Sequence, residues 1–383
     1  MRQFFATLCL AMLLVSCGGG SGSTTDVTPP PASGPTPAEI LEAQLEGLSL
    51  NEFYEASYAA LLYRSPETII WQALTGPYPL DEVGLDDISA AYRRDTLAMY
   101  EVVLEALRAY DAAGLSPADK LSYDFYEWYL RDAVDGQDFL YYPFVAAYNF
   151  MGEHTGTETF FTEIHPLRSV DDANDYITRL QDVPRKFGDL VEFLDLQNGA
   201  GIVEPRLTIG DSLYGIDQIA DATAASVSYY TAFRDKLGDI EGLSDVDRQA
   251  LLNRALAATR DRVIPAYRAL RSKLQQLHGL APSTIGVRQY PMGREYYDYT
   301  LRHRTTTDLS AAEIHQLGRD HLQRVHAEMR VIFDELGYPE NESLGELYQR
   351  VAQDGGIIPA AEVKATYETI IDAAELELDA AFD

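Results

Sequence analysis

Four of the chain's seven histidines lie in one short segment, and clustered histidines are common metal ligands. They are His303, His315, His321 and His326, within the sequence HRTTTDLSAAEIHQLGRDHLQRVHAEM. A single helix holds zinc when two of its histidines are four residues apart, because both imidazoles then face the same ion. The spacing of these histidines therefore decides whether the segment can be a metal site by itself.

The second part of this segment has the signals of one long helix. Ser310 and Glu313 have the spacing of a capping box, so the helix should begin at Ala311. Apolar residues then recur at helical spacing as far as Leu336, and Gly337 follows as a stop signal.

That helix keeps its histidines apart. His315 and His326 are about 20° apart around the axis but roughly 16 Å apart along it. His321 lies more than about 100° around the helix from each of them. We therefore predict no metal site within this segment and interpret the histidines as solvated or capping residues. His303 and His315 are the two that could reach a cleft formed with other segments.

Helical signals also dominate the rest of the chain. A hydroxyl residue stands three positions before a carboxylate at each of five predicted helix starts: Thr36, Ser49, Ser116, Ser169 and Ser244. Gly114 and Gly279 are predicted to end helices, and Pro265 to kink one. Short strands are predicted only at residues 202–210 and 284–292. The predicted fold is mainly α, a large multi-helix domain with few short strands.

Composition limits the class of partner. The chain has 383 residues, of which 46% are hydrophobic, which is enough for a large buried core. It carries 60 acidic against 30 basic side chains, a formal charge of -30. Because this charge repels polyanions over most of the surface, we predict no nucleic-acid partner.

The N-terminus resembles a bacterial lipoprotein signal. Residues 1–17 combine Arg2, a short apolar run and a lipobox-like end in which Cys17 would be acylated, anchoring the protein in a membrane without a spanning helix. Gly18 in the next position favours the outer membrane by that resemblance, facing the periplasm or the cell surface. Residues 18–37 are rich in Gly, Ser, Thr and Pro and are predicted to be a tether. Residues 38–383 then form the helical domain.

Several segments, in the same order along the chain, resemble the bacterial family called domain of unknown function 885. They are LYRSPE, LSYDFYEWYL, FFTEIHPLRSVDDANDYITRLQDVP, IPAYRAL, and YPMGREYYDYTL with the histidine segment after it. The resemblance covers about residues 40–383. It implies a two-lobed helical fold similar to zinc metallopeptidases, of which this chain matches the N-terminal lobe.

The resemblance also implies a zinc site of the HExxH kind in full-length members, with a glutamate as general base on a zinc-bound water. None of the seven histidines here begins such a motif. We therefore expect the catalytic residues beyond Asp383, no metal site or cofactor in this chain, and no activity of the chain alone. The acidic, uncapped final helix, in which no cation follows Lys364, agrees with a chain that is incomplete at its C-terminus.

Tyrosines near the histidine segment are the candidates for substrate contact. Tyr296, Tyr297 and His303 are predicted to line a peptide-binding groove, since tyrosine offers both an apolar face and a hydroxyl. Packing between helices is the alternative role for these rings. Asn149 and His154 are further polar candidates. Two functions remain open: the substrate-recognition part of a zinc peptidase in the cell envelope, or a non-catalytic helical lipoprotein that binds peptides or a partner protein.

Overall fold

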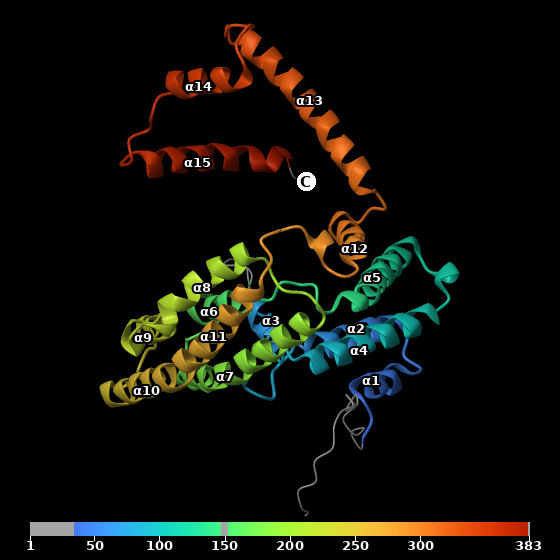
Figure 1. The fold of residues 1–383 in the computed structure, drawn as a ribbon, viewed down its shortest axis with the longest axis vertical. Coiled ribbons are helices and arrows are strands. Elements are labelled where there is room, and N and C mark those ends of the chain that lie inside the picture. The colour runs from blue at the N-terminus through green and yellow to red at the C-terminus, as the bar shows by residue number, and fades with distance from the viewer. Residues whose placement is uncertain (1–33, 147–151, 382–383) are drawn as a thin grey trace, which may run out of the picture.

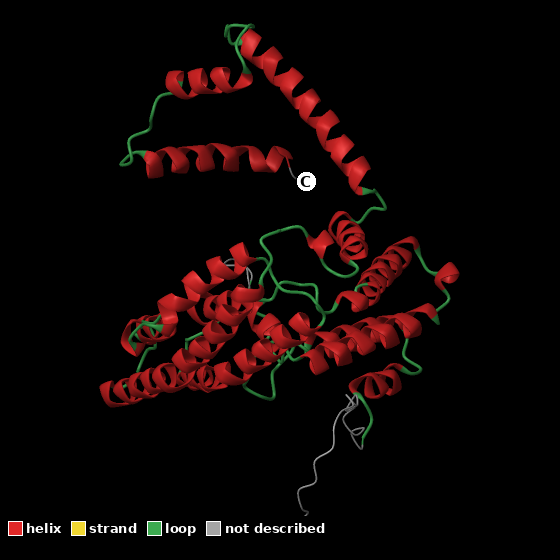
Figure 2. Cartoon of the chain, viewed as in Figure 1, coloured by secondary structure: helices red, strands yellow, loops and turns green. Residues whose placement is uncertain are grey.

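The computed structural model describes residues 34–146 and 152–381, and every regular element in these ranges is helical (Figures 1 and 2). The signal, Cys17, most of the tether and Asn149 lie outside the described residues. The α-helices are α1 Pro37–Leu45, α2 Leu50–Leu62, α3 Pro66–Trp71, α4 Ala90–Arg108, α5 Pro117–Asp135, α6 Glu153–Thr159, α7 Val170–Gly199, α8 Arg206–Ala220, α9 Ser228–Leu237, α10 Asp245–Ala258, α11 Ile264–Leu280, α12 Gly293–Thr305, α13 Ala311–Glu335, α14 Leu344–Asp354 and α15 Val363–Ala381.

The predicted helix starts are confirmed. At Thr36, Ser49 and Ser310 both halves of a capping box form, and the hydroxyls of Ser116, Ser169 and Ser244 accept a hydrogen bond from the backbone N–H three residues on. Helix α13 begins at Ala311 and ends at Glu335, with Gly337 in the left-handed conformation two residues later. These caps depend on contacts within three residues, which is why the sequence predicts them well.

The two strand predictions are wrong. Residues 206–210 open α8, and residues 284–292 contain only a 3-10 turn, Val287–Gln289. In α8 the buried positions Ile209, Ser212, Ile216 and Ile219 recur at helical spacing, so the β-branched run packs as one face of a helix. A short apolar run does not distinguish a strand from a buried helix.

Two glycine predictions are also wrong, whereas the break near Pro265 is present. Helix α4 ends at Arg108, before Gly114, and α11 continues through Gly279 to Leu280. Pro265 lies in the first turn of α11, directly after a π-helical turn at Thr259–Val263 that joins α10 to α11. Proline lacks the N–H of a regular ladder, and the wider turn accommodates that loss.

Two hydrophobic cores hold the body of the molecule, which we define as residues 34–305. The first core joins α7 to α8, α9, α10 and α11, and it contains the fully buried rings of Tyr176, Phe187 and Tyr229. The second joins α1, α2, α4 and α5 around Phe53 and Leu107. A small third cluster, including Phe139, Tyr142 and Tyr290, packs against α12 where the two groups of helices meet.

Helices α13, α14 and α15 extend away from this body (Figure 1). We call residues 311–381 the C-terminal arm. Within its described side chains only Phe333 and Leu347 are buried. No helix in the described ranges is both long and apolar enough to cross a lipid bilayer.

Candidate functional site

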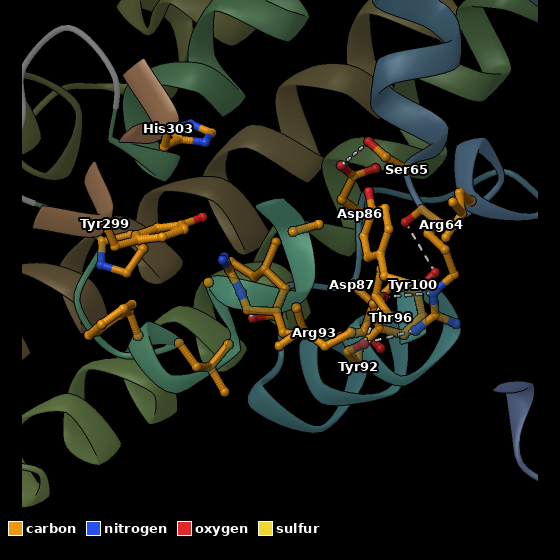
Figure 3. A pocket seen from close by; sticks show the side chains of 18 of the residues that line it. Arg64, Ser65, Asp86, Asp87, Tyr92, Arg93, Thr96, Tyr100, Tyr299 and His303 are labelled. Atoms are coloured by element: carbon orange, nitrogen blue, oxygen red, sulfur yellow. Dashed lines mark hydrogen bonds between the residues drawn. The ribbon is translucent and has the colours of Figure 1, made fainter. Parts of the chain in front are cut away.

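A cleft of about 630 Å³ lies where α12 approaches the two groups of helices in the body. We call it the α12 cleft. Its walls come from the ends of α2 and α5, the start of α4, the loop before α6, and α12 (Figure 3). Segments more than a hundred residues apart in the sequence therefore contribute side chains to one cavity.

Aromatic rings form the α12 wall. Tyr299 stacks on Phe139 with 5.3 Å between ring centroids and on His303 with 5.8 Å. Tyr296 packs against Phe139 and, at 4.7 Å, against Tyr142. Tyr296, Tyr299 and His303 are at positions i, i+3 and i+7 of α12, so they share one face of the helix.

Two long-range hydrogen bonds hold this wall in place. The Nδ1–H of His303 donates to the Asp132 carboxylate over 2.6 Å, and the Tyr299 hydroxyl donates to the Asp132 carbonyl over 3.2 Å. Gly136 is required here, because a Cβ at that position would collide with the Tyr299 hydroxyl. Within the described ranges Nε2 of His303 has no hydrogen-bond partner, and this nitrogen can accept a hydrogen bond in the neutral ring or donate one in the protonated ring.

The opposite wall is built on Arg64. Its guanidinium lies 3.2 Å from the centroid of the Tyr92 ring, in cation–π geometry. It also donates hydrogen bonds to the Thr96 hydroxyl and to the Tyr92 carbonyl, each over 2.9 Å. These contacts join α2 to α4 and hold the end of α2 at the cleft.

A charged network extends from the lining of the cleft into the interior of the body. Lys186 of α7 is only 2% exposed, and its ammonium donates to both carboxylate oxygens of Glu67 over 2.8 and 2.9 Å and lies 3.7 Å from Glu153. Arg93 donates to Glu153 over 3.1 Å. Asp86 accepts from the Ser65 hydroxyl over 2.6 Å. Buried charges persist only when they are paired in this way.

Burial shifts the proton affinities in this network. It raises the pKa of Asp86 to about 6, and the neighbouring Glu67 carboxylate adds to that effect, while Lys186 and the hydrogen bonds from Ser65 and the Glu67 backbone oppose it. For Lys186, burial alone lowers the pKa, but the carboxylates of Glu67, Glu153 and Asp86 outweigh burial and raise it. Lys186 therefore stays charged, and Asp86 is the group of the network that titrates near neutral pH.

The structure separates the three predicted groove residues. Tyr296 and His303 line the α12 cleft. Tyr297 lies about 100° around α12 from Tyr296, is 45% exposed, and faces a separate hollow beside Arg294. His154 is buried and has no hydrogen-bond partner among the described residues, and burial lowers its pKa to about 4.

The histidines of α13 lie in the arm. His315, His321 and His326 are all exposed, in agreement with the prediction that they are solvated. No group of three or more His, Cys, Asp or Glu side chains in the described ranges is arranged to hold a metal ion. The described residues therefore do not form the zinc site that the family resemblance implies for full-length members.

Sequence reasoning missed most of the cleft. Arg64, Asp86, Arg93 and Asp132 were not predicted as site residues, because each acts through partners far away in the chain. One signal was present: the segment LYRSPE, which the sequence analysis singled out, supplies Arg64, Ser65 and Glu67. Helical spacing on α12 also indicates that Tyr299, rather than Tyr297, shares a face with Tyr296 and His303.

Comparison with known proteins identifies the family of this chain. A family model described as "Bacterial protein of unknown function (DUF885)" matches residues 71–383. No curated protein shows significant similarity to the chain. Among solved structures, the chain is similar to "the putative lipoprotein from Colwellia psychrerythraea", with a TM-score of 0.77 and 18% sequence identity.

That match covers 89% of this chain and 59% of the other chain, so the present chain spans less than two thirds of its solved relative. At this identity the similarity shows a shared helical fold. The family model, in contrast, spans most of the sequence and includes α4 to α15, with α12 and, of the charged network, Asp86, Arg93, Glu153 and Lys186. The chain therefore belongs to the bacterial DUF885 family.

Proposed function

We propose that the α12 cleft binds peptides, and that the chain is the substrate-recognition part of a zinc-dependent peptidase of the cell envelope. The observation that carries the proposal is the cleft itself, in which an aromatic wall with a free histidine nitrogen faces a polar wall. Ligand sites usually combine apolar surface with a few placed polar groups in this manner. A peptide needs both, because its side chains are often apolar while its backbone must form hydrogen bonds.

The polar groups suit a peptide backbone. His303 is oriented by Asp132, so its Nε2 can accept from a peptide N–H or, when protonated, donate to a carbonyl. Arg304 also lines the cleft and is exposed, which makes its guanidinium available to a carbonyl or carboxylate. The rings of Tyr296 and Tyr299 provide flat apolar surface beside them.

Family membership and location complete the proposal. The catalytic zinc would be held by protein outside the residues described here, since these do not form a zinc site. Acylation at Cys17 would place the cleft in the cell envelope, at the outer membrane by the resemblance of the signal. The lack of a zinc site in the described ranges favours one alternative, a lipoprotein that binds peptides without cleaving them.

The test is peptide binding to the full chain. A library of dye-labelled octapeptides is screened by fluorescence polarisation, and the best binder is measured against variants. We expect His303→Ala to weaken binding about tenfold or more, because a placed polar group is lost. Tyr297→Ala is the matched control on the same helix and should bind like the unaltered chain.

Failure of every octapeptide to bind would refute peptide recognition. Equal losses in His303→Ala and Tyr297→Ala would show that binding occurs elsewhere. The alternative is separated by a second measurement on the native protein recovered from cells. Zinc content with peptide cleavage supports the peptidase, whereas binding without either supports the non-catalytic lipoprotein.

A further inference from the structure

A second cavity, of about 520 Å³, lies beside the α12 cleft between α2, α3, α4 and α5. We call it the aromatic groove. It is lined mainly by rings and aliphatic side chains: Tyr58, Leu62, Tyr100, Phe125, Tyr126 and Tyr129. Leu61, Ser65 and Tyr100 line both cavities, so the groove adjoins the cleft.

The rings of the groove are fixed by contacts behind them. Tyr126 and Tyr129 are parallel, with centroids 6.3 Å apart and an interplanar angle of 10°. The Tyr126 hydroxyl is hydrogen-bonded to Ser57 over 2.9 Å, and the Tyr129 hydroxyl to Tyr100 over 3.1 Å. Because these hydroxyls are already paired within the protein, the groove presents ring surface to a ligand more than polar groups.

Three rings of the lining stay open to solvent. Phe125 is 67% exposed, Tyr58 44% and Tyr129 43%. Apolar rings beside a cavity, with no covering segment in the described chain, gain stability when a ligand removes them from water. The volume also falls in the range of ordinary ligand pockets.

The charge of the lining restricts what the groove accepts. None of its ten lining residues is ionisable near neutral pH, although the chain as a whole has a formal charge of -30. The α12 cleft next to it is lined by Arg64, Asp86, Arg93 and Glu153. The two cavities therefore differ in chemistry, and the groove suits an uncharged apolar group attached to a ligand in the cleft.

From this geometry we propose that the aromatic groove is a side-chain subsite that accepts an aromatic residue of a peptide bound in the α12 cleft. The proposal rests on the proposed function and adds its specificity. An aromatic ring suits parallel tyrosines because offset stacking and edge-to-face contacts add to the burial of apolar area. Tyr100, which lines both cavities, would lie where the side chain leaves the peptide backbone.

The chain carries its own reporter for this subsite. Its two tryptophans are Trp71, next to the lining residue Gln72, and Trp128, whose ring lies 6.3 Å from that of Phe125. Intrinsic tryptophan fluorescence of the full chain is therefore titrated with three capped tetrapeptides, Ala-Ala-Phe-Ala, Ala-Ala-Ala-Ala and Ala-Ala-Lys-Ala. A competition measurement with the labelled octapeptide gives each affinity independently of the fluorescence change.

We expect the phenylalanine peptide to bind about tenfold or more tightly than the alanine peptide. Phe125→Ala and Tyr58→Ala should each reduce that preference to about twofold, without weakening the alanine peptide. Both residues are exposed, so these variants should fold. Tyr214→Ala, at a position of α8 that is 71% exposed and far from the groove in sequence, is the control and should keep the full preference.

Other outcomes overturn the inference in distinguishable ways. Equal binding of the phenylalanine and alanine peptides would refute the subsite and leave peptide binding in the cleft intact. Preference for the lysine peptide would mean that the groove is a cation site and not an aromatic subsite, since ring faces also attract cations. If neither the tetrapeptides nor any octapeptide binds the chain, the proposed function and the subsite fail together.

Discussion

Helices α7 and α13 have similar sequence patterns but different surroundings. Each begins with a serine cap, and each carries a stripe of apolar residues. Of the 30 residues of α7, 12 are buried, whereas α13 buries only Phe333 among its 25. An amphipathic pattern therefore predicts a helix and its apolar face, but a neighbouring element is needed to cover that face.

Individual positions show the size of this difference. Phe187 and Leu190 of α7 are each 1% exposed, because α10 and α11 pack against that helix. Leu322 and Ile332 of α13 are 53% and 54% exposed. The apolar face of the C-terminal arm is thus open in this structure, and the body carries nearly all of the tertiary stability.

The largest expected effect is loss of the buried ammonium in α7. Lys186→Met leaves the Glu67 carboxylate without its cation and Glu153 with Arg93 alone, so the free energy of unfolding should fall by about 3–5 kcal/mol. Lys364→Met is the matched change in the arm. The Lys364 side chain is 88% exposed beside Glu368, and its loss should cost less than about 0.5 kcal/mol.

The free energy of unfolding of both variants is measured by urea titration, monitored by circular dichroism. Similar losses in the two variants would break the comparison, because they would mean that the arm is as tightly packed in solution as the body.

Apolar truncations give the next effect. Leu190→Ala removes a fully packed side chain and should destabilise the body by about 2–5 kcal/mol. Leu322→Ala, the same change on the open face of α13, should alter stability by less than about 0.5 kcal/mol. Both midpoints are read from urea titrations. A loss above about 2 kcal/mol for Leu322→Ala would show that another surface covers the arm in solution.

The charged network should make the free energy of unfolding of the body depend on pH. The pKa of Asp86 is raised from 3.8 to about 6 by burial, so the folded state holds a proton that the unfolded state releases earlier. The contribution of Asp86 to stability is therefore fully present below pH 4, falls as the pH rises through 6, and is constant above that. Each pKa unit corresponds to about 1.4 kcal/mol.

Asp86→Asn removes this titration and nearly preserves the shape of the side chain. The difference in unfolding free energy between the unaltered chain and the variant should change by roughly 2 kcal/mol between pH 4 and 7, with the unaltered chain relatively weaker at pH 7. His154 and His165 give stability a pH dependence of the opposite sign, because burial lowers their pKa values to about 4. Both proteins contain these histidines, so their contribution cancels in the difference. A constant difference across this range would contradict the assignment.

The smallest expected effects come from helix caps. Ser244→Ala in the body and Ser310→Ala in the arm each remove a hydroxyl that accepts from a backbone N–H, a loss of about 1 kcal/mol to the local helix. In the body this loss should appear in global unfolding. In the arm it should appear only as faster amide hydrogen exchange in the first turns of α13, because the arm opens without the body.

Local sequence signals account for the helices and tertiary contacts account for the site. The capping box at Ser310 and the stop at Gly337 predict α13 to within one residue of its end. The strand prediction at residues 202–210 failed because Ile209 and Ile216 are buried by packing on α11, which a short apolar run does not reveal. Tyr296 and His303 were predicted as groove residues, but Asp132, which orients His303, was not.

The sequence by itself determined where the capped helices begin and which of their faces are apolar, because caps and amphipathic spacing act over three or four residues. Only the tertiary structure decided which apolar faces are covered and which side chains form the cleft. The His303–Asp132 hydrogen bond spans 171 residues and the Lys186–Glu67 pair spans 119. Contacts over such separations depend on how whole helices pack, and packing is a property of the complete set of faces rather than of any one segment.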